Sequence, residues 1–209
     1  SCAGSGSDGC SNCDGWTCDA GVEPNPSGGG VAYTYAALGR CDACMMGWGS
    51  NYFDGALRDV RLYARALPED EVAVLAALWD PPPALPAHWW ALTEAADGGT
   101  TAFDAGYGSA ANLELKGGAT FLGPDAGGSV LLPNGGATKT SFLDFGGGGL
   151  TFAAVGGVTF AAFVRHDSFQ AGGTLLYLYD RGGNLIILQN HGATRRAQWA
   201  IQDDGTQKY

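Results

Sequence analysis

The sequence predicts an all-β protein of short antiparallel strands, with one short α-helix near residues 68–78. Glycine is abundant, at 35 of 209 residues, and only 15% of residues are charged, which suits many turns between short strands. Residues 56–63 alternate between apolar and charged side chains, as a strand with one wet face does. Residues 68–78 then change to helical spacing, with Pro68 at the first helical position and acidic residues in the first turn.

The strand at residues 56–63 carries one irregularity. Its alternation slips around Asp59, which predicts a β-bulge at that position. Two predictions concern later strands. Residues 158–165 are apolar on both faces, which predicts a central strand. Residues 173–179 and 185–188 are separated by a Gly- and Asn-rich turn, which predicts a hairpin.

Composition and charge exclude several classes of function. Apolar residues make up 45% of the chain, which argues against a disordered protein. The formal net charge of −10 argues against nucleic acid as a partner. No run of apolar residues is long enough to predict a membrane span in this segment. The chain begins at Ser1 without a signal peptide, and we therefore expect it to be a piece of a longer polypeptide.

All six cysteines lie within residues 1–50, where Gly, Ser, Asp and Asn leave too few apolar side chains for a core. One interpretation is a four-cysteine zinc site, because Cys10-x2-Cys13 and Cys41-x2-Cys44 have the spacing of zinc knuckles. The other is three disulfides in an oxidising compartment, which better fits the even count and the acidic surroundings. We predict disulfides, with their pairing left open, among Cys2, Cys10, Cys13, Cys18, Cys41 and Cys44.

Residues 53–75 contain a dense motif. Its residues are Phe53-Asp54-Gly55, Asp59-Val60-Arg61-Leu62-Tyr63, Arg65-Ala66-Leu67, Glu71-Val72 and Leu75. The motif resembles the phrase F-D-G-x-I-D-x-V-R-I-Y-x-R-A-L-x-x-x-E-I-x-x-L, with which laminin-G-like domains of the concanavalin A-like (pentraxin-like) class often end. The resemblance implies an antiparallel β-sandwich of the jelly-roll type. It implies little about function, because function lies in sites placed on a fold.

A second set of motif residues follows the proline run Pro81-Pro82-Pro83, which favours a stiff spacer. These residues resemble the opening of the same family, W-x-L-x-E, then G-x-x-A-x-D, then G-A-x-F. They are Trp90, Leu92, Glu94, Thr101, Ala102, Asp104, Gly118, Ala119 and Phe121.

The resemblance implies three parts. Residues 1–79 would be the C-terminal part of one laminin-G-like sandwich with Cys-rich loops, 80–87 a Pro-rich linker, and 88–209 the N-terminal part of a second sandwich. One arrangement is tandem repeats in a long chain, in which each partial unit completes a neighbour. In the other, the two parts pack together as one permuted sandwich. The sequence leaves both arrangements open.

Asp54, Asp59 and Asp104 are the candidate metal ligands. The laminin-G-like resemblance implies Ca2+ at these positions, because members of the class often bind calcium through an early-loop Asp and acids near the closing phrase. Carboxylate oxygens suit this hard cation. The family's Asn-rich loop is replaced here by residues 105–110, AGYGSA, which lack several expected ligands. The alternative for Asp104 is a turn cap.

Tyr107, Trp16 and Trp48 are the candidate carbohydrate-binding residues. They lie in loop-like stretches, where exposed aromatic rings can stack on sugars. Tyr107 stands between two glycines and is predicted to be the most exposed of the three. The alternative for Trp48 is a packing role in the core or against a disulfide.

The sequence gives no reason to expect an enzyme. Glycosidases of related fold need two nearby carboxylates, which would appear as alternating acids on a strand, and the sequence has no such pattern. The cluster Glu69-Asp70-Glu71 is explained by the helix N-terminus. The histidines His88, His166 and His191 lie far apart, without a serine elbow or zinc motif beside them.

These observations predict a structural or adhesive module of a large secreted, repetitive protein of a cell surface, a matrix or an extracellular filament. Its expected partners are copies of itself or neighbouring repeats of the same chain. The apparent tandem units, the stapled loops and the rigid linker favour this prediction. The alternative is a Ca2+-dependent, lectin-like carbohydrate-binding module. A third possibility is a non-catalytic domain attached to a secreted hydrolase.

Overall fold

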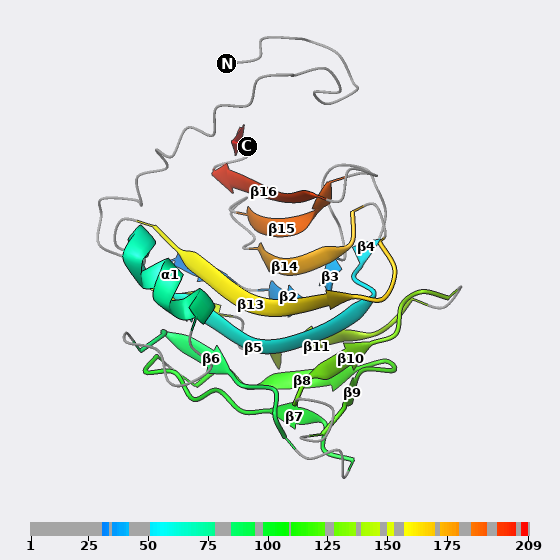
Figure 1. Cartoon of the computed structure of the whole chain (residues 1–209). Coiled ribbons are helices and arrows are strands. Elements are labelled where there is room, and N and C mark those ends of the chain that lie inside the picture. The colour runs from blue at the N-terminus through cyan, green and yellow to red at the C-terminus, as the bar shows by residue number, and fades with distance from the viewer. Residues whose placement is uncertain are drawn as a thin grey trace, which may run out of the picture.

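Figure 1 shows the computed structural model of the chain, which consists mostly of antiparallel β-sheets with one short helix. Two main sheets lie one behind the other, and the helix α1 (Glu69–Ala77) lies at the edge of the front one. The structure describes residues 31–33, 35–41, 51–77, 85–94, 98–108, 110–123, 128–136, 139–146, 150–152, 157–169, 172–179, 185–191, 196–203 and 206–208.

The smaller main sheet has five strands. Its order is β13 (Thr159–His166), β5 (Gly55–Tyr63), β10 (Val130–Leu132) and β9 (Thr120–Phe121), and β6 (His88–Trp90) also pairs with β5. All of these pairs are antiparallel. One edge of β5 is shared between β10 and β6, and the other edge is taken by β13.

The larger main sheet has eight strands, and its pairs are also antiparallel. Its order is β17 (Thr206–Lys208), β16 (Arg196–Asp203), β15 (Leu185–His191), β14 (Thr174–Tyr179), β2 (Tyr35–Leu38), β11 (Phe142–Asp144), β8 (Leu113–Lys116) and β7 (Thr101–Ala102). Two short pairs accompany the main sheets: β1 (Val31–Tyr33) with β12 (Leu150–Phe152), and β3 (Arg40–Cys41) with β4 (Asn51–Tyr52).

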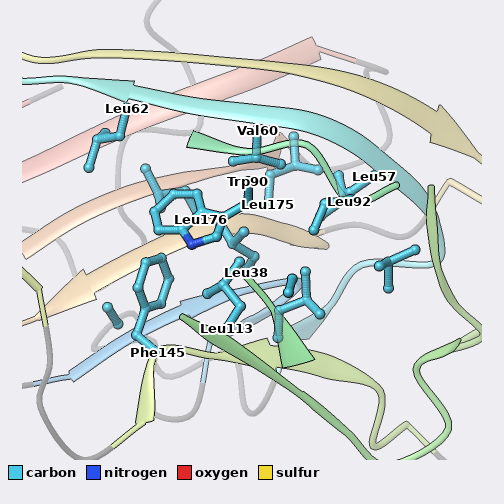
Figure 2. Close-up of a cluster of buried hydrophobic side chains, with 14 of the residues drawn as sticks. Leu38, Leu57, Val60, Leu62, Trp90, Leu92, Leu113, Phe145, Leu175 and Leu176 are labelled. Carbon is cyan, nitrogen blue, oxygen red and sulfur yellow. The ribbon is translucent and has the colours of Figure 1, made fainter. Parts of the chain in front are cut away.

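The core lies between the two main sheets (Figure 2). The front sheet contributes Leu57, Val60 and Leu62 from β5, and the back sheet contributes Leu38 and Leu176, among others. Apolar side chains from both layers therefore form one buried cluster, and burial of this kind contributes roughly 25 cal/mol per Å2. The predicted all-β fold of antiparallel sheets with one short helix is confirmed.

Three local predictions are also confirmed. The helix α1 occupies Glu69–Ala77, within the predicted range. The hairpin is formed by β14 and β15. The bulge is seen in the register of β5 and β13. Arg61 pairs with Ala161 and Arg58 pairs with Phe163, so β5 advances by three residues where β13 advances by two.

The prediction that residues 158–165 form a central strand is wrong. Among the described strands, β13 pairs only with β5 and ends the smaller sheet. Its second half, from Phe163 to His166, is exposed. The reason is that an apolar run shows neither which edges of a strand are paired nor whether both of its faces are covered. Phe160 and Ala162 pack against the core, while other apolar side chains of the strand meet solvent.

The two parts of the chain share both main sheets. β5, from the first part, lies between β13 and the pair β6 and β10 from the second part. Likewise, β2 lies between β14 and β11. In the described residues, strands of both parts of the chain therefore pair within the same two sheets.

Candidate functional site

Asp104 follows β7 and organises the loop that leads to Ala111. Its Oδ1 accepts hydrogen bonds from the backbone N–H groups of Trp89 and Gly106, each at 2.9 Å, and its Oδ2 accepts one from Ala111 at 3.1 Å. Oδ2 also lies 2.7 Å from Nδ1 of His88, and both of these side chains are 1% exposed. Four contacts occupy the lone pairs of the carboxylate, so Asp104 anchors this loop to β6.

The hydrogen bonds also determine the charge of Asp104. Burial raises the pKa of its carboxyl, but the bonds from His88 and from three backbone N–H groups outweigh burial and hold this pKa below the ordinary value. A carboxylate beside Nδ1 favours the tautomer of His88 with the proton on that nitrogen. Within the described residues, the buried Nε2 atom of His88 has no hydrogen-bond partner, and the ring stacks on Trp90 with 5.6 Å between centroids.

Asp59 lies in the bulge of β5, where its φ is 50°. Its Oδ1 accepts hydrogen bonds from Nε1 of Trp89 at 2.7 Å and from Nε of Arg61 at 2.8 Å, and its Oδ2 lies 2.7 Å from Nη2 of Arg61. The guanidinium of Arg61 lies 5.3 Å from the centre of the Trp89 ring. Asp59 and Asp104 therefore bind the same residue, Trp89, through its side chain and its backbone respectively.

Asp54 lies just before β5, in a separate buried network. Its Oδ1 accepts a hydrogen bond from the backbone N–H of Asn134 at 2.8 Å, and its Oδ2 accepts one from the hydroxyl of Ser168 at 2.5 Å. Asn134 is fully buried and donates through Nδ2 to the carbonyls of Phe53 and Ser141, at 2.7 and 2.8 Å. The network ties together the segments that precede β5, precede β11 and follow β13.

The three predicted metal ligands are thus divided between two networks. Each carboxylate already accepts hydrogen bonds from this chain, and a Ca2+ ion, which takes about six to eight oxygen ligands, would have to displace them. Within the described part of the chain, there is no group of three or more His, Cys, Asp or Glu side chains that could hold a metal ion. The hydrogen bonds account for these three carboxylates as anchors of loops. Calcium binding by them stays a prediction.

Tyr107 has the exposed position that the sequence predicts, with 64% of its surface accessible. Its backbone N–H donates to the carbonyl of Pro86 at 3.2 Å, and that of Gly108 donates to Ala87 at 2.8 Å. A Cβ atom on Gly106 would lie 2.2 Å from the carbonyl oxygen of Ala87, and one on Gly108 would lie 2.8 Å from it. The two glycines therefore let the loop lie close against residues 86–87 and present the ring of Tyr107 to solvent.

Other candidate residues lie outside the described residues. They include Trp16, Trp48 and every cysteine except Cys41. Cys41 is fully buried in β3 and is disulfide-bonded. Its partner lies outside the described residues, and the predicted set of three disulfides stays a prediction.

A shallow groove of about 430 Å3 beside β13 is a feature that the sequence did not indicate. The helix α1 lines it with Val72, Leu75 and Ala76, and residues 159–164 of β13 line the opposite wall. Apolar side chains stay accessible here: Val72 is 46% exposed, and Phe163 and Val164 are each 38% exposed. The lining of the groove is therefore mostly apolar, with Asp59 and Arg61 as its charged members.

His88 and Asn134 are the network residues that sequence reasoning missed. His88 directly precedes two tryptophans and shows no ligand motif. Asn134 lies in a Pro-Asn-Gly-Gly turn signal, which predicts a turn but not a buried side chain. Their partners Asp104 and Asp54 are 16 and 80 residues away in the sequence, so no local pattern could have connected them.

Two further results bear on identity. In the part of the chain that the structure describes, no helix has the length and apolar character needed to cross a membrane. The chain matches no protein-family model, no curated protein and no solved structure.

Proposed function

We propose that this chain is a structural or adhesive module of a large secreted, repetitive protein in a cell surface, an extracellular matrix or an extracellular filament. The observation that carries the proposal is the gathering of exposed apolar side chains around β13. Of the large apolar residues that are exposed in the described part of the chain, four lie there: Val72, Phe163, Val164 and Trp199. Contiguous apolar surface on a secreted domain marks a contact with another molecule.

The proposed fold family is the laminin-G-like, concanavalin A-like jelly roll. One contact supports this assignment beyond the resemblance itself. The strand of the closing phrase, β5, pairs with the strand of the opening motif, β6, with Val60 opposite Trp90. When the first and last strands of a domain are neighbours, their order along the chain can be permuted without changing the packing. The partners are copies of the module or neighbouring repeats of the same polypeptide.

Negative-stain electron microscopy of the native material tests the structural function. We expect regular fibres or sheets whose repeat matches one or two sandwiches. A chelator-washed aliquot is the control that separates association through calcium from association through apolar contacts. Dispersed single particles in both aliquots would contradict the proposal.

A pair of variants in the same native chain locates the contact. Val164→Lys places a charge in the apolar surface at β13, and we expect it to shorten or abolish the assemblies. Leu85→Lys is the matched control, because Leu85 is 65% exposed but does not line the groove beside β13. Equal effects of the two variants would show that the contact lies elsewhere.

Carbohydrate binding at Tyr107 is the second candidate function. The exposed ring, on a loop held by backbone hydrogen bonds, is a suitable platform for stacking on a sugar. A panel of oligosaccharides tests it, with and without a chelator. Because Asp104 holds the loop through protein hydrogen bonds, we expect binding to survive the chelator. Loss of binding on chelation would favour the Ca2+-dependent form, and absence of binding would remove this candidate.

A further inference from the structure

Residues 31–63, here called the donor segment, make most of their strand pairs with later parts of the chain. Among the described strands of this segment, only β3 and β4 pair with each other. By contrast, β1 pairs with β12, β2 pairs with β11 and β14, and β5 pairs with β6, β10 and β13. The strands that follow residue 85 therefore hold the donor segment in place.

The strands that follow residue 85, here called the acceptor part, have a gap within each main sheet where the donor segment lies. In the smaller sheet, β5 lies between β13 and β6 (Figure 1). Without β5, neither β13 nor β6 has a strand partner among the described strands. Without β2, the larger sheet divides between β14 and β11. The acceptor part therefore contains two slots, each the width of one strand.

Apolar side chains of the donor segment complete the core of the acceptor part. Leu38, Leu57 and Leu62 of the donor segment are each at most 1% exposed. They belong to the same buried cluster as Trp90 and Leu176 of the acceptor part (Figure 2). Because burial of apolar surface is the main favourable term both in folding and in association, the slots have a strong preference to be filled.

Polar contacts and one glycine fix the register of β5 in its slot. Asp54 accepts a hydrogen bond from the backbone N–H of Asn134 at 2.8 Å, across the two parts. Asp59 accepts one from Nε1 of Trp89 at 2.7 Å. A Cβ atom on Gly55 would lie 1.9 Å from a backbone carbonyl oxygen of β13, so the slot admits only glycine at this position. These contacts select a segment of this same sequence.

The connection between the two parts, residues 64–85, is attached by few contacts where the structure describes it. None of the residues of its helix α1 is buried. The hydroxyl of Thr159 joins it to β13, by accepting from the N–H of Leu67 and donating to the carbonyl of Arg65, each at 3.0 Å. Releasing the connection therefore disrupts much less packing than removing β5 or β2 from its slot.

The connection is long enough to reach another copy of the chain. With α1 kept helical, residues 64–85 could span roughly 60 Å. A domain of this size has a diameter of roughly 45 Å. The run Pro81-Pro82-Pro83 favours an extended conformation. A slot forms the same contacts with a donor segment from its own chain or from a second copy, so the connection and the local concentration of copies decide between them.

From these observations we infer that residues 31–63 are an exchangeable donor segment, which fills the two slots of a second copy of this chain. Exchange that continues from copy to copy gives a filament, whereas reciprocal exchange gives a closed dimer. The inference rests on the proposed structural function, because it names a contact by which such a module joins its neighbours. This contact does not involve the apolar surface beside β13.

The first test uses the unmodified chain. The chain is unfolded in urea without a reductant, refolded at high concentration and then diluted, and its size is followed by chromatography. We expect oligomers that persist after dilution to a concentration at which the directly refolded chain is a monomer, because separating exchanged copies requires removing strands from both sheets. Monomers at every concentration would overturn the inference, and so would oligomers that dissociate promptly on dilution.

A second test identifies the exchanged strands. Ala56 of β5 and Leu131 of β10 lie opposite each other in an antiparallel pair, at a separation that suits a disulfide. In a chain with Ala56→Cys and Leu131→Cys, a closed copy forms this link within itself, whereas exchanged copies form it with one another. We expect most of the oligomer fraction to run as dimers or a longer ladder on a denaturing gel without reductant, with the link located by peptide mass spectrometry.

The matched control is a chain with Thr101→Cys and Glu114→Cys. These positions of β7 and β8 lie opposite each other within the acceptor part, so their link stays inside one chain in closed and exchanged copies alike. If the link between positions 56 and 131 forms only within chains, or if the control gives an equal ladder, the inference is overturned. Far-UV circular dichroism checks that both variants are folded, and the dilution experiment decides if either is not.

The two tests separate the inference from the proposed function. Regular native fibres that contain only closed copies would contradict strand exchange alone. Exchanged oligomers of a chain whose native material stays dispersed would contradict the structural role alone.

Discussion

The two edges of β5 meet very different surroundings. On one edge, β6 and β10 bring Trp90, which is 1% exposed, and the loop anchored by Asp104. On the other edge, β13 leaves Phe163 and Val164 each 38% exposed. The first edge is closed by buried side chains and hydrogen bonds of the chain itself, while the strand paired to the second edge carries partly exposed apolar side chains.

The difference between the two sides separates residues that stabilise the fold from residues that we expect to act in association. Polar groups on the closed side find partners within the chain: Asp104 accepts four hydrogen bonds, and Asn134 takes part in a buried network. On the open side, apolar side chains such as Phe163 and Val164 are partly exposed to solvent. We therefore expect substitutions on the closed side to change the free energy of unfolding, and substitutions on the open side to change association.

The largest effect should come from the core tryptophan of the closed side. The indole of Trp90 donates to the carbonyl of Ala111 at 2.7 Å, and its ring lies 5.1 Å from that of Phe145. Trp90→Ala removes this packing and leaves a cavity, so we expect a loss of about 4 kcal/mol in urea unfolding followed by circular dichroism. The matched variant Trp199→Ala, on the open side, should cost less than about 1 kcal/mol. Equal losses of unfolding free energy in Trp90→Ala and Trp199→Ala would show that the two sides contribute alike to stability.

Next in size is the anchor of the 104–111 loop. Asp104→Asn places an amide where the carboxylate accepts four hydrogen bonds, and we expect it to cost about 3 kcal/mol at pH 7. The pKa of Asp104 is lower in the folded chain than in the unfolded one, so its ionised form stabilises the fold above the unfolded value. That contribution is lost as the pH falls through the folded pKa. The difference in the free energy of unfolding between the native chain and Asp104→Asn should therefore become smaller below about pH 4.

Urea unfolding of both proteins at pH 7, 5 and 3 measures this prediction. Asp167→Asn is the control, because Asp167 pairs with Arg165 at the surface, where both side chains are well exposed. Surface pairs of this kind contribute about 0.5 kcal/mol. A difference for Asp104→Asn that stays constant over the whole pH range would show that hydrogen bonding to an ionised carboxylate is not its cause.

Local features of the fold could be predicted from the sequence. The strand with its bulge at Asp59, the helix α1 and the hairpin of β14 and β15 all follow from patterns within a few residues. The exposure of Tyr107 between two glycines belongs to the same class. Such features depend on side-chain period and turn chemistry, which a single sequence displays directly.

Features that depend on distant pairing could not be predicted. Nothing in residues 158–165 shows that β13 has a partner on one edge only, because the same apolar pattern would suit a strand with two neighbours. The hydrogen bond between Asp54 and Asn134 joins residues 80 positions apart. The sequence predicts Asp54, Asp59 and Asp104 as metal ligands, but only the folded chain shows which donors already occupy their oxygens.

A smaller effect should follow from the buried amide near β5. Asn134→Ala leaves the carbonyls of Phe53 and Ser141 and one backbone N–H without their partner, and we expect a loss of about 2 kcal/mol in urea unfolding. Asn112→Ala is matched in residue type. Its side-chain Oδ1 accepts a hydrogen bond from the N–H of Asp104 at the surface, so a loss of about 0.5 kcal/mol is expected. If Asn134→Ala lost no more unfolding free energy than Asn112→Ala, the buried network would contribute little to the stability of the fold.

The smallest effect on stability should come from Tyr107, which lies on the closed side yet faces solvent. Tyr107→Ala removes a ring that is 64% exposed, while the backbone bonds of its loop are unaffected, so the free energy of unfolding should change by less than about 0.5 kcal/mol. If the loop binds sugar, affinity should fall at least tenfold. Phe103→Ala, 62% exposed and just outside the loop, is the control that should keep its affinity. A large stability loss in Tyr107→Ala would instead mean that the ring packs on the closed side, and that a sugar-stacking role for it is wrong.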